Sequence, residues 1–176
     1  PRHERPQVLL SYTVELVVRQ SKSQGRLTAS KAVAVTVTNV DEAPVFATAA
    51  TLNAAEQGTA VATLVASDPE RAAIAYTIAG GADQALFAIN AQTGELSFVS
   101  AQDYQNPGDA DHDRVYEVTV RASDGSLHTD RAFTVTLTDV NQTPGFTSAT
   151  TASVSENVAS VMTVTAQDPD AGTTLT

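Results

Sequence analysis

The chain repeats itself at an offset of 100 residues. Residues 31–46 read KAVAVTVTNVDEAPVF and residues 131–146 read RAFTVTLTDVNQTPGF, and the two segments align without a gap. The register continues further along the chain, where Asp68-Pro69 matches Asp168-Pro169. A sequence that repeats at a fixed period is an array of similar structural units, so its function is to be sought in the unit and in the junctions between units.

The repeat predicts how the 176 residues divide into domains. A unit of about 100 residues is large enough to bury its own core. We expect the C-terminal strands of a preceding partial repeat in 1–44, a complete repeat in 45–144, and the N-terminal strands of a following partial repeat in 145–176. The two partial units suggest an excerpt of a longer protein.

Cysteine usage and hydropathy limit the compartment. The chain has no cysteine, which for a secreted all-β array favours a bacterial over an animal surface protein. No run of about 18 apolar residues exists that could span a membrane. The N-terminal stretch PRHERPQVLLSYTVELVV alternates apolar with polar residues, unlike a signal peptide. Any export signal is therefore expected outside this sequence.

Charge is unevenly distributed. Six of the ten basic residues fall in the first 31 positions, whereas the remaining 145 residues hold four basic and eighteen acidic residues. A body this acidic repels nucleic acid and attracts cations wherever its carboxylates cluster. The basic head resembles a diverged copy of residues 116–127, so local divergence is favoured over a functional basic patch.

Strict alternation of apolar and polar residues dominates the chain. Residues 116–120 read YEVTV and residues 133–137 read FTVTL, and a similar alternation runs through 12–18 and 33–37. This period predicts half-buried β-strands, and no segment sustains a helical period. In the central unit we expect seven short antiparallel strands, near 46–53, 59–67, 73–79, 85–90, 95–100, 114–123 and 130–139. The predicted fold class is all-β, an immunoglobulin-like Greek-key β-sandwich in tandem repeats.

Turn residues separate these strands. Gly80-Gly81, Thr93-Gly94 and Asp124-Gly125-Ser126 mark turns, and the spacing around Thr93-Gly94 indicates a short hairpin. In residues 61–66 the apolar alternation changes parity once, and it does so again at 161–166. A β-bulge at this place in each copy would explain both changes.

Acidic residues stand where the expected strands end. Glu56 follows the first strand, Asp68 the second and Asp124 the sixth, and Asp103 precedes the polar loop. Alternate strand ends of such a sandwich lie at the same pole, which predicts that Asp68 meets Asp124 and that Glu56 meets Asp103. Carboxylates gathered at a domain boundary repel each other unless a cation neutralises them. Oxygen ligands without histidine or thiol favour calcium over zinc or copper.

An ordered set of motifs now resembles a known family. The motifs are AEQG at 55–58, ASDPE at 66–70, FAINAQTGEL at 87–96, QDYQ at 102–105, YEVTVRASDG at 116–125 and DVNQTP at 139–144. In this order and spacing the chain resembles cadherin-type repeats, in particular the cadherin-like repeats of large bacterial surface proteins. The resemblance covers the whole chain.

The resemblance implies calcium ions between successive repeats, held by residues of both repeats and of the linker. For the junction near 39–44 the implied ligands are Asp41, the Ala43 carbonyl, Asp68, Glu70 and Asp124, with Asn39 and Glu42 in the linker shell. For the junction near 139–144 they are Glu56, Asp103, Asp139, Asn141, Asp168 and Asp170.

Two departures from the family pattern lie at the second junction. The family's L-D-x-E segment is Gln102-Asp103-Tyr104-Gln105 here, and the linker carboxylate is replaced by Gln142. Two amides in place of two carboxylates lower the negative charge and should weaken calcium binding. The first junction, which keeps Asp41 and Glu42, is thus the stronger predicted site.

A third acidic group, Asp109-Ala110-Asp111-His112-Asp113-Arg114, resembles the opening of an EF-hand loop. Arg114 stands where the EF-hand glycine belongs, and Val120 stands where its closing glutamate belongs. We interpret the segment as a solvated hairpin loop whose acids could still hold a cation weakly.

Little in the sequence supports catalysis. Three histidines share no spacing with a nucleophile. Paired carboxylates leave a glycosidase open by residue type, but the absence of tryptophan disfavours one.

The resemblance implies a non-enzymatic, extracellular, calcium-binding adhesion module. Its implied partners are calcium, neighbouring repeats and a cell-surface protein or glycan. The alternatives are a calcium-independent spacer and a carbohydrate-binding sandwich attached to a secreted enzyme, for which the candidate aromatic residues are Tyr76, Phe98, Tyr104 and Tyr116.

Overall fold

The computed structural model describes residues 10–22, 25–170 and 172–174. Contacts divide the chain into two units, one ending at Glu42 and the other beginning at Ala43. The described residues form strands and one short 3₁₀ helix, and none of them lies in a helix long and apolar enough to cross a membrane.

The first unit is a long antiparallel hairpin. Strands β1 (Leu10–Lys22) and β2 (Gly25–Val37) pair with Val14 opposite Val33, and the alternating sequence is extended as predicted. Both valines are exposed, contrary to the expected half-burial, because the described part of this unit holds no second layer to cover the hairpin. Most side chains of the basic head lie outside the described residues, namely those of Arg2, Arg5, Arg19, Lys22 and Arg26.

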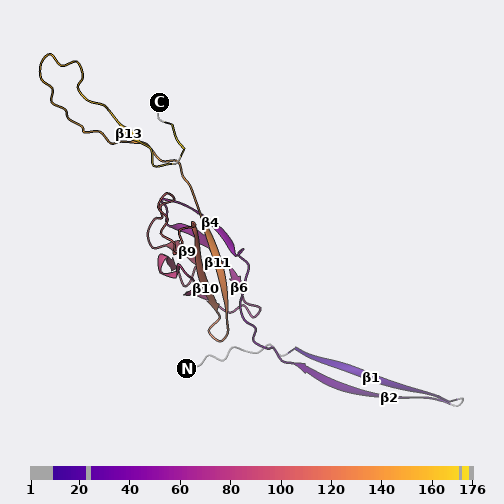
Figure 1. The fold of residues 1–176 in the computed structure, drawn as a ribbon. Helices are drawn as coiled ribbons and strands as arrows, with labels where there is room; N and C mark the ends of the chain where they lie inside the picture. Colours follow the sequence, from indigo (N-terminus) through magenta and orange to yellow (C-terminus); the bar gives the residue numbers. More distant parts are fainter. Residues whose placement is uncertain (1–9, 23–24, 171, 175–176) are drawn as a thin grey trace. The chain divides into compact units, whose positions relative to one another are not determined.

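The second unit contains a two-layer β-sandwich (Figure 1). One sheet has the strand order β4 (Thr51–Ala55), β11 (His128–Thr138), β10 (Val115–Ser123) and β7 (Ala75–Gly80). The other has the order β5 (Ala60–Thr63), β9 (Glu95–Phe98) and β8 (Phe87–Ile89), and the 3₁₀ helix η1 (Gln84–Leu86) precedes β8.

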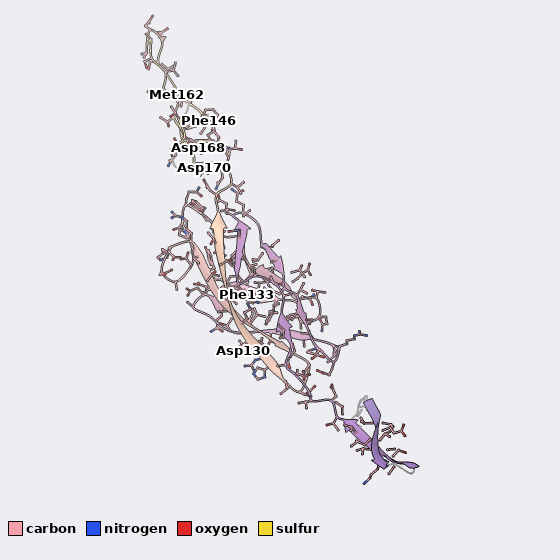
Figure 2. All side chains as sticks on the ribbon, turned by 90° about the vertical axis from the view of Figure 1, so that its right-hand side faces the viewer. Asp130, Phe133, Phe146, Met162, Asp168 and Asp170 are labelled. Carbon is pink, nitrogen blue, oxygen red and sulfur yellow. The ribbon has the colours of Figure 1, made fainter. Side chains whose placement is uncertain are left out.

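The core lies between these sheets. The alternating apolar residues of β10 and β11 are buried as predicted, with Tyr116 and Phe133 fully enclosed. Figure 2 places Phe133 in the middle of the sandwich. Across the core the ring of Tyr116 meets that of Phe98 edge to face, with 5.0 Å between the ring centroids. Burial of such aromatic and β-branched side chains supplies most of the stability of a sandwich.

The predicted strands 46–53 and 59–67 are each divided into two shorter strands, and part of the first pairs in an unexpected direction. The predicted strand 46–53 becomes β3 (Val45–Phe46), which pairs with β6 (Ala66–Ser67), and β4, which pairs with β11. The β4–β11 pairing is parallel, so the expectation of an all-antiparallel sandwich was wrong. The cause is a change of sheet after Phe46: Ala47 donates to the carbonyl of Val65, and the chain then crosses to the edge of β11.

The predicted bulge is present in one copy only. The register of β5 against β9 shifts between Ala60 and Ala62, as the change of parity indicated. In the other copy, Val161 and Val164 lie outside any strand and are exposed. A bulge needs a partner strand to be irregular against, and the described residues offer none there.

One strand pair of the sequence repeat recurs in the structure. Strands β12 (Gly145–Phe146) and β13 (Ala166–Gln167) pair in the same register as β3 and β6, with Phe146 opposite Ala166. Phe46 is 7% exposed and Phe146 is 80% exposed, because only the former has a sandwich to pack into. The repeat boundaries at residues 44 and 144 stay a prediction.

The turn glycine Gly81 lies against the backbone of β10. Its φ is +112°, and a Cβ there would lie 2.4 Å from the Glu117 carbonyl oxygen. We expect Gly81→Ala to destabilise the domain by about 2 kcal/mol, combining backbone strain with a clash. The matched variant is Gly125→Ala, with φ +100° but nothing within 4 Å, which should cost about 1 kcal/mol. Thermal unfolding of both variants measures the difference, and equal losses would contradict the clash.

Candidate metal centre

Glu56 joins three segments at the end of the sandwich where β4 and β11 finish. It follows β4, is 3% exposed, and donates its own N–H to the Thr138 carbonyl. Its Oε1 accepts the N–H of Val140 at 2.9 Å, and its Oε2 accepts the N–H of Tyr104 at 3.0 Å. The strand ends thus bring Glu56 to the segment that holds Asp103, as the sequence predicted.

Three carboxylates converge at this end of the domain. Glu56, Asp139 and Asp170 each offer an oxygen, and these oxygens all lie within 4.8 Å of one another. Asp139 follows β11, whereas Asp170 follows β13, beyond the linker. Figure 2 shows Asp168 and Asp170 close to the end of β11. The group therefore combines residues from both sides of the junction, and we call it the junction triad.

Two glutamine side chains lie among the carboxylates of the junction triad. The Gln105 amide donates to Asp139 Oδ1 at 2.8 Å and to Asp170 Oδ1 at 3.2 Å. The Gln142 amide donates to Glu56 Oε2 at 3.2 Å and to Gln105 Oε1 at 3.3 Å, while the Gln142 N–H donates to Asp170. Each triad carboxylate thus receives at least one amide N–H from these two residues.

The environment shifts two of these acids in opposite directions. Burial raises the pKa of Glu56, but the hydrogen bonds from the N–H groups of Tyr104 and Val140, together with those to the Asp139 and Gln142 side chains, lower that pKa overall. The pKa of Asp139 is raised, first by desolvation and then by the nearby carboxylates of Glu56 and Asp170, against the Gln105 hydrogen bond that lowers it. Glu56 is therefore held as an anion while Asp139 bears the repulsion between like charges.

The other predicted ligands of this junction shape its loops. Asp103 Oδ1 accepts the N–H groups of Gln105 and Asn106, and Asp168 Oδ1 accepts the N–H of Asp170. Asn141 donates to the Gln142 carbonyl. These three lie on the segments that carry the triad and its amides, but they are not members of the triad.

The donor set of the junction triad fits calcium. Calcium takes oxygen ligands at about 2.3–2.6 Å, so two oxygens on one ion can lie at most about 5 Å apart. The 4.8 Å limit on the triad oxygens meets this condition. A half-turn of each glutamine amide would present its oxygen to the ion in place of its N–H₂ group. The site would then have as many oxygen ligands as one with glutamates at these two positions, but less negative charge. The sequence indicated the lower charge and missed the amides' role as donors.

The other predicted junction involves both units. Asp68 is buried, with Oδ1 accepting the Ala72 N–H and Oδ2 lacking a hydrogen-bond partner among the described residues. Asp124 Oδ1 accepts two N–H groups of its own turn. Among the described residues, Asp68, Glu70 and Asp124 do not form a group with three oxygens within 4.8 Å of one another. Their assignment to one calcium site with Asp41, Glu42 and the Ala43 carbonyl stays a prediction.

A second acidic group lies inside the sandwich domain. Oxygens of Asp109, Asp111 and Asp113 all lie within 4.8 Å of one another. The pKa of Asp111 is raised, by desolvation first and then by the charges of Asp113 and Asp109. Asp109 is only 1% exposed, so the interpretation of this segment as a solvated loop was wrong for that residue. We call this group the loop triad.

The aromatic residues considered for carbohydrate binding are mostly internal. Tyr76, Phe98 and Tyr116 belong to the core. Tyr104 is half-buried, and the Arg114 guanidinium lies 4.6 Å from its ring centroid. These four side chains therefore do not form an exposed stacking platform.

A comparison with protein families matches residues 48–140 to the model of the cadherin domain. No curated relative matches the chain. The matched segment begins between β3 and β4 and ends just after β11, and so covers nearly all of the sandwich described above.

Solved structures give the same fold. Human protocadherin-24 EC1-2 (form II) matches at 29% identity with a TM-score of 0.52, over 76% of this chain and 64% of that one. Protocadherin gamma B2 domains 3–6 match at 24% with a TM-score of 0.58, over 92% and 43%. Drosophila N-cadherin EC1-4 matches at 14% with a TM-score of 0.52, over 90% and 41%. The chain thus spans less than two thirds of each of these proteins.

Proposed function

The chain belongs to the cadherin family, and we propose that it is a structural module of a calcium-stiffened tandem array that serves adhesion at a cell surface. Cadherin domains are extracellular and their family is non-catalytic, so we infer that this chain is not an enzyme. The absence of cysteine favours a bacterial surface protein.

The observation that carries the proposal is the composition of the junction triad. Glu56 and Asp139 come from the sandwich, whereas Asp170 comes from the segment after the linker, and their oxygens share one small volume. Because the cluster contains carboxylates from both sides of the linker, a cation that binds all three of them would hold the two sides together. A bound calcium ion would supply that attraction, because its two positive charges would offset most of the negative charge of the three carboxylates.

The chain's own residues prepare this connection. The N–H groups of Tyr104 and Val140 hold the Glu56 carboxylate in place. The N–H of Gln142 and the Gln105 amide hold Asp170 from the other side of the linker. Because these donors fix the carboxylates beforehand, less conformational entropy is lost when a cation binds.

Two rival functions make different predictions. A calcium-independent spacer would keep its dimensions when calcium is removed. A carbohydrate-binding sandwich needs an exposed aromatic platform, and three of its four candidate residues are core residues. The second rival is therefore disfavoured by the packing, and the first is left to experiment.

We expect calcium to extend and stiffen the chain, and Asp139→Asn with Asp170→Asn to abolish the part of this effect due to the junction triad. Small-angle scattering of the chain with calcium and with chelator measures the maximum dimension, and calorimetric titration measures the number of ions bound. The double variant should bind at least one ion fewer than the unmodified chain.

The matched control is Asp130→Asn. Asp130 pairs with Arg121 at 2.7 Å and lies towards the other end of β11 from Asp170 (Figure 2). This variant loses one carboxylate without touching the junction triad, so its scattering and stoichiometry should match those of the unmodified chain. If the maximum dimension of the unmodified chain is the same in calcium and in chelator, the stiffening function is refuted and the calcium-independent spacer is supported.

A further inference from the structure

We propose that the loop triad, Asp109, Asp111 and Asp113, is a calcium site inside the repeat, separate from the junction triad. The three carboxylates come from one loop that precedes β10. Their oxygens lie within 4.8 Å of one another, the same limit that the junction triad meets and one that calcium can bridge.

The buried member of the loop triad has an unused acceptor. Asp109 Oδ2 accepts the N–H of Asp113 at 2.7 Å and that of Arg114 at 3.3 Å. Asp109 Oδ1 is buried without a hydrogen-bond partner among the described residues, on a side chain that is 1% exposed. A buried carboxylate oxygen that receives neither a proton donor nor a cation is costly. A cation among the three carboxylates would remove this cost.

The neighbouring buried acid fixes the loop. Asp83 is 5% exposed, and its two oxygens accept the N–H groups of Ala110 and Glu117, each at 2.8 Å. These hydrogen bonds hold the start of the loop against β10, and they give both oxygens of Asp83 a donor without a metal ion. The triad is thus held on a rigid part of the sandwich, which favours binding without large ordering costs.

The arginine and histidine side chains of the loop have polar partners outside the loop triad. Arg114 donates its Nε to the Tyr104 carbonyl at 2.8 Å and lies over the Tyr104 ring. His112 Nδ1 is 2.8 Å from the Pro107 carbonyl oxygen. Three carboxylates without a histidine ligand form a hard oxygen site, which suits calcium rather than zinc. Asp111 and Asp113 are exposed, so water molecules can complete the coordination.

Amide NMR spectra of the chain during a calcium chloride titration test this site directly. We expect the Ala110 and Asp113 amide signals to shift with calcium in the unmodified chain and in the variant carrying Asp139→Asn with Asp170→Asn. The same signals should stay in place in a variant carrying Asp111→Asn with Asp113→Asn, and calorimetry should show one ion fewer. Both substituted side chains are exposed, so the second variant should keep its fold.

The outcomes separate the two calcium sites. Loop amides that stay in place in the unmodified chain, or that still shift in Asp111→Asn with Asp113→Asn, would overturn the loop site and leave the proposed junction function intact. Loop shifts that survive the junction substitutions support a site independent of that function. Loop shifts that vanish with the junction substitutions would show that one junction ion caused them all.

Discussion

Replacing Glu56 with alanine should destabilise the domain more than any other single change considered for this chain. The carboxylate is almost fully buried and accepts hydrogen bonds from the Tyr104 N–H, the Val140 N–H and the Gln142 amide. Hydrogen bonds to charged acceptors contribute about 1.5–3 kcal/mol each, and their donors would lose their partner in a confined space. We expect a loss of about 4 kcal/mol, or about 15 °C or more in the melting temperature.

The measurement is thermal unfolding in chelator, so that calcium binding does not contribute. Glu56→Gln is the matched variant, since it keeps the shape and one carbonyl acceptor while placing an amide N–H₂ against one of the former donors. It should lose about half as much stability. A Glu56→Ala variant that melts with the unmodified domain would show that these hydrogen bonds do not hold the end of the sandwich.

The pH dependence of this contribution has a definite sign. The folded domain lowers the pKa of Glu56, so the unfolded chain takes up the proton first as the pH falls. The contribution of Glu56 is therefore fully present above the pKa of an ordinary glutamate and is lost as the pH falls through its lowered folded value. The pKa of Asp139 is raised, so its contribution has the opposite sign: it is present at low pH and lost as the pH rises.

The sequence predicted the sandwich well because two-residue alternation reports directly on burial. Tyr116 and Phe133 are core residues in the strands where the pattern placed them. The parallel pairing of β4 with β11 could not be predicted in this way, since alternation shows which face of a strand is buried but not the direction of its neighbour. The exposed face of the β1–β2 hairpin shows the same limit, because the pattern assumes a covering layer.

The candidate site was predicted in part, and for a physical reason. Acidic residues at strand ends placed Glu56 correctly beside the segment after residue 102, because strand direction determines the pole at which an end lies. Counting charges then ranked the 139–144 junction as the weaker site. That count treated Gln105 and Gln142 only as lost ligands. Their N–H₂ groups reach the carboxylates instead, which depends on side-chain geometry that no count of charges contains.

Restoring the two carboxylates should strengthen calcium binding at the junction triad. In the variant carrying Gln105→Glu with Gln142→Glu, we expect calcium affinity to rise about a hundredfold, because the affinity of an oxygen site depends strongly on the number of charged ligands. Calorimetric titration of this variant against the unmodified chain measures the change. The matched control is Gln92→Glu, which adds a charge on the exposed β8–β9 turn and should leave the affinity of the junction triad unchanged.

The same substitutions should weaken the junction when calcium is absent. Gln105 and Gln142 donate to all three carboxylates of the junction triad, and glutamates would replace these donors with like charges. In chelator the double variant should therefore melt below the unmodified chain, and in saturating calcium above it. This reversal distinguishes amides that stabilise the calcium-free junction by donating hydrogen bonds to the carboxylates from amides that only lower its negative charge. A variant that melts with the unmodified chain in chelator would show that the amide hydrogen bonds contribute nothing to the junction.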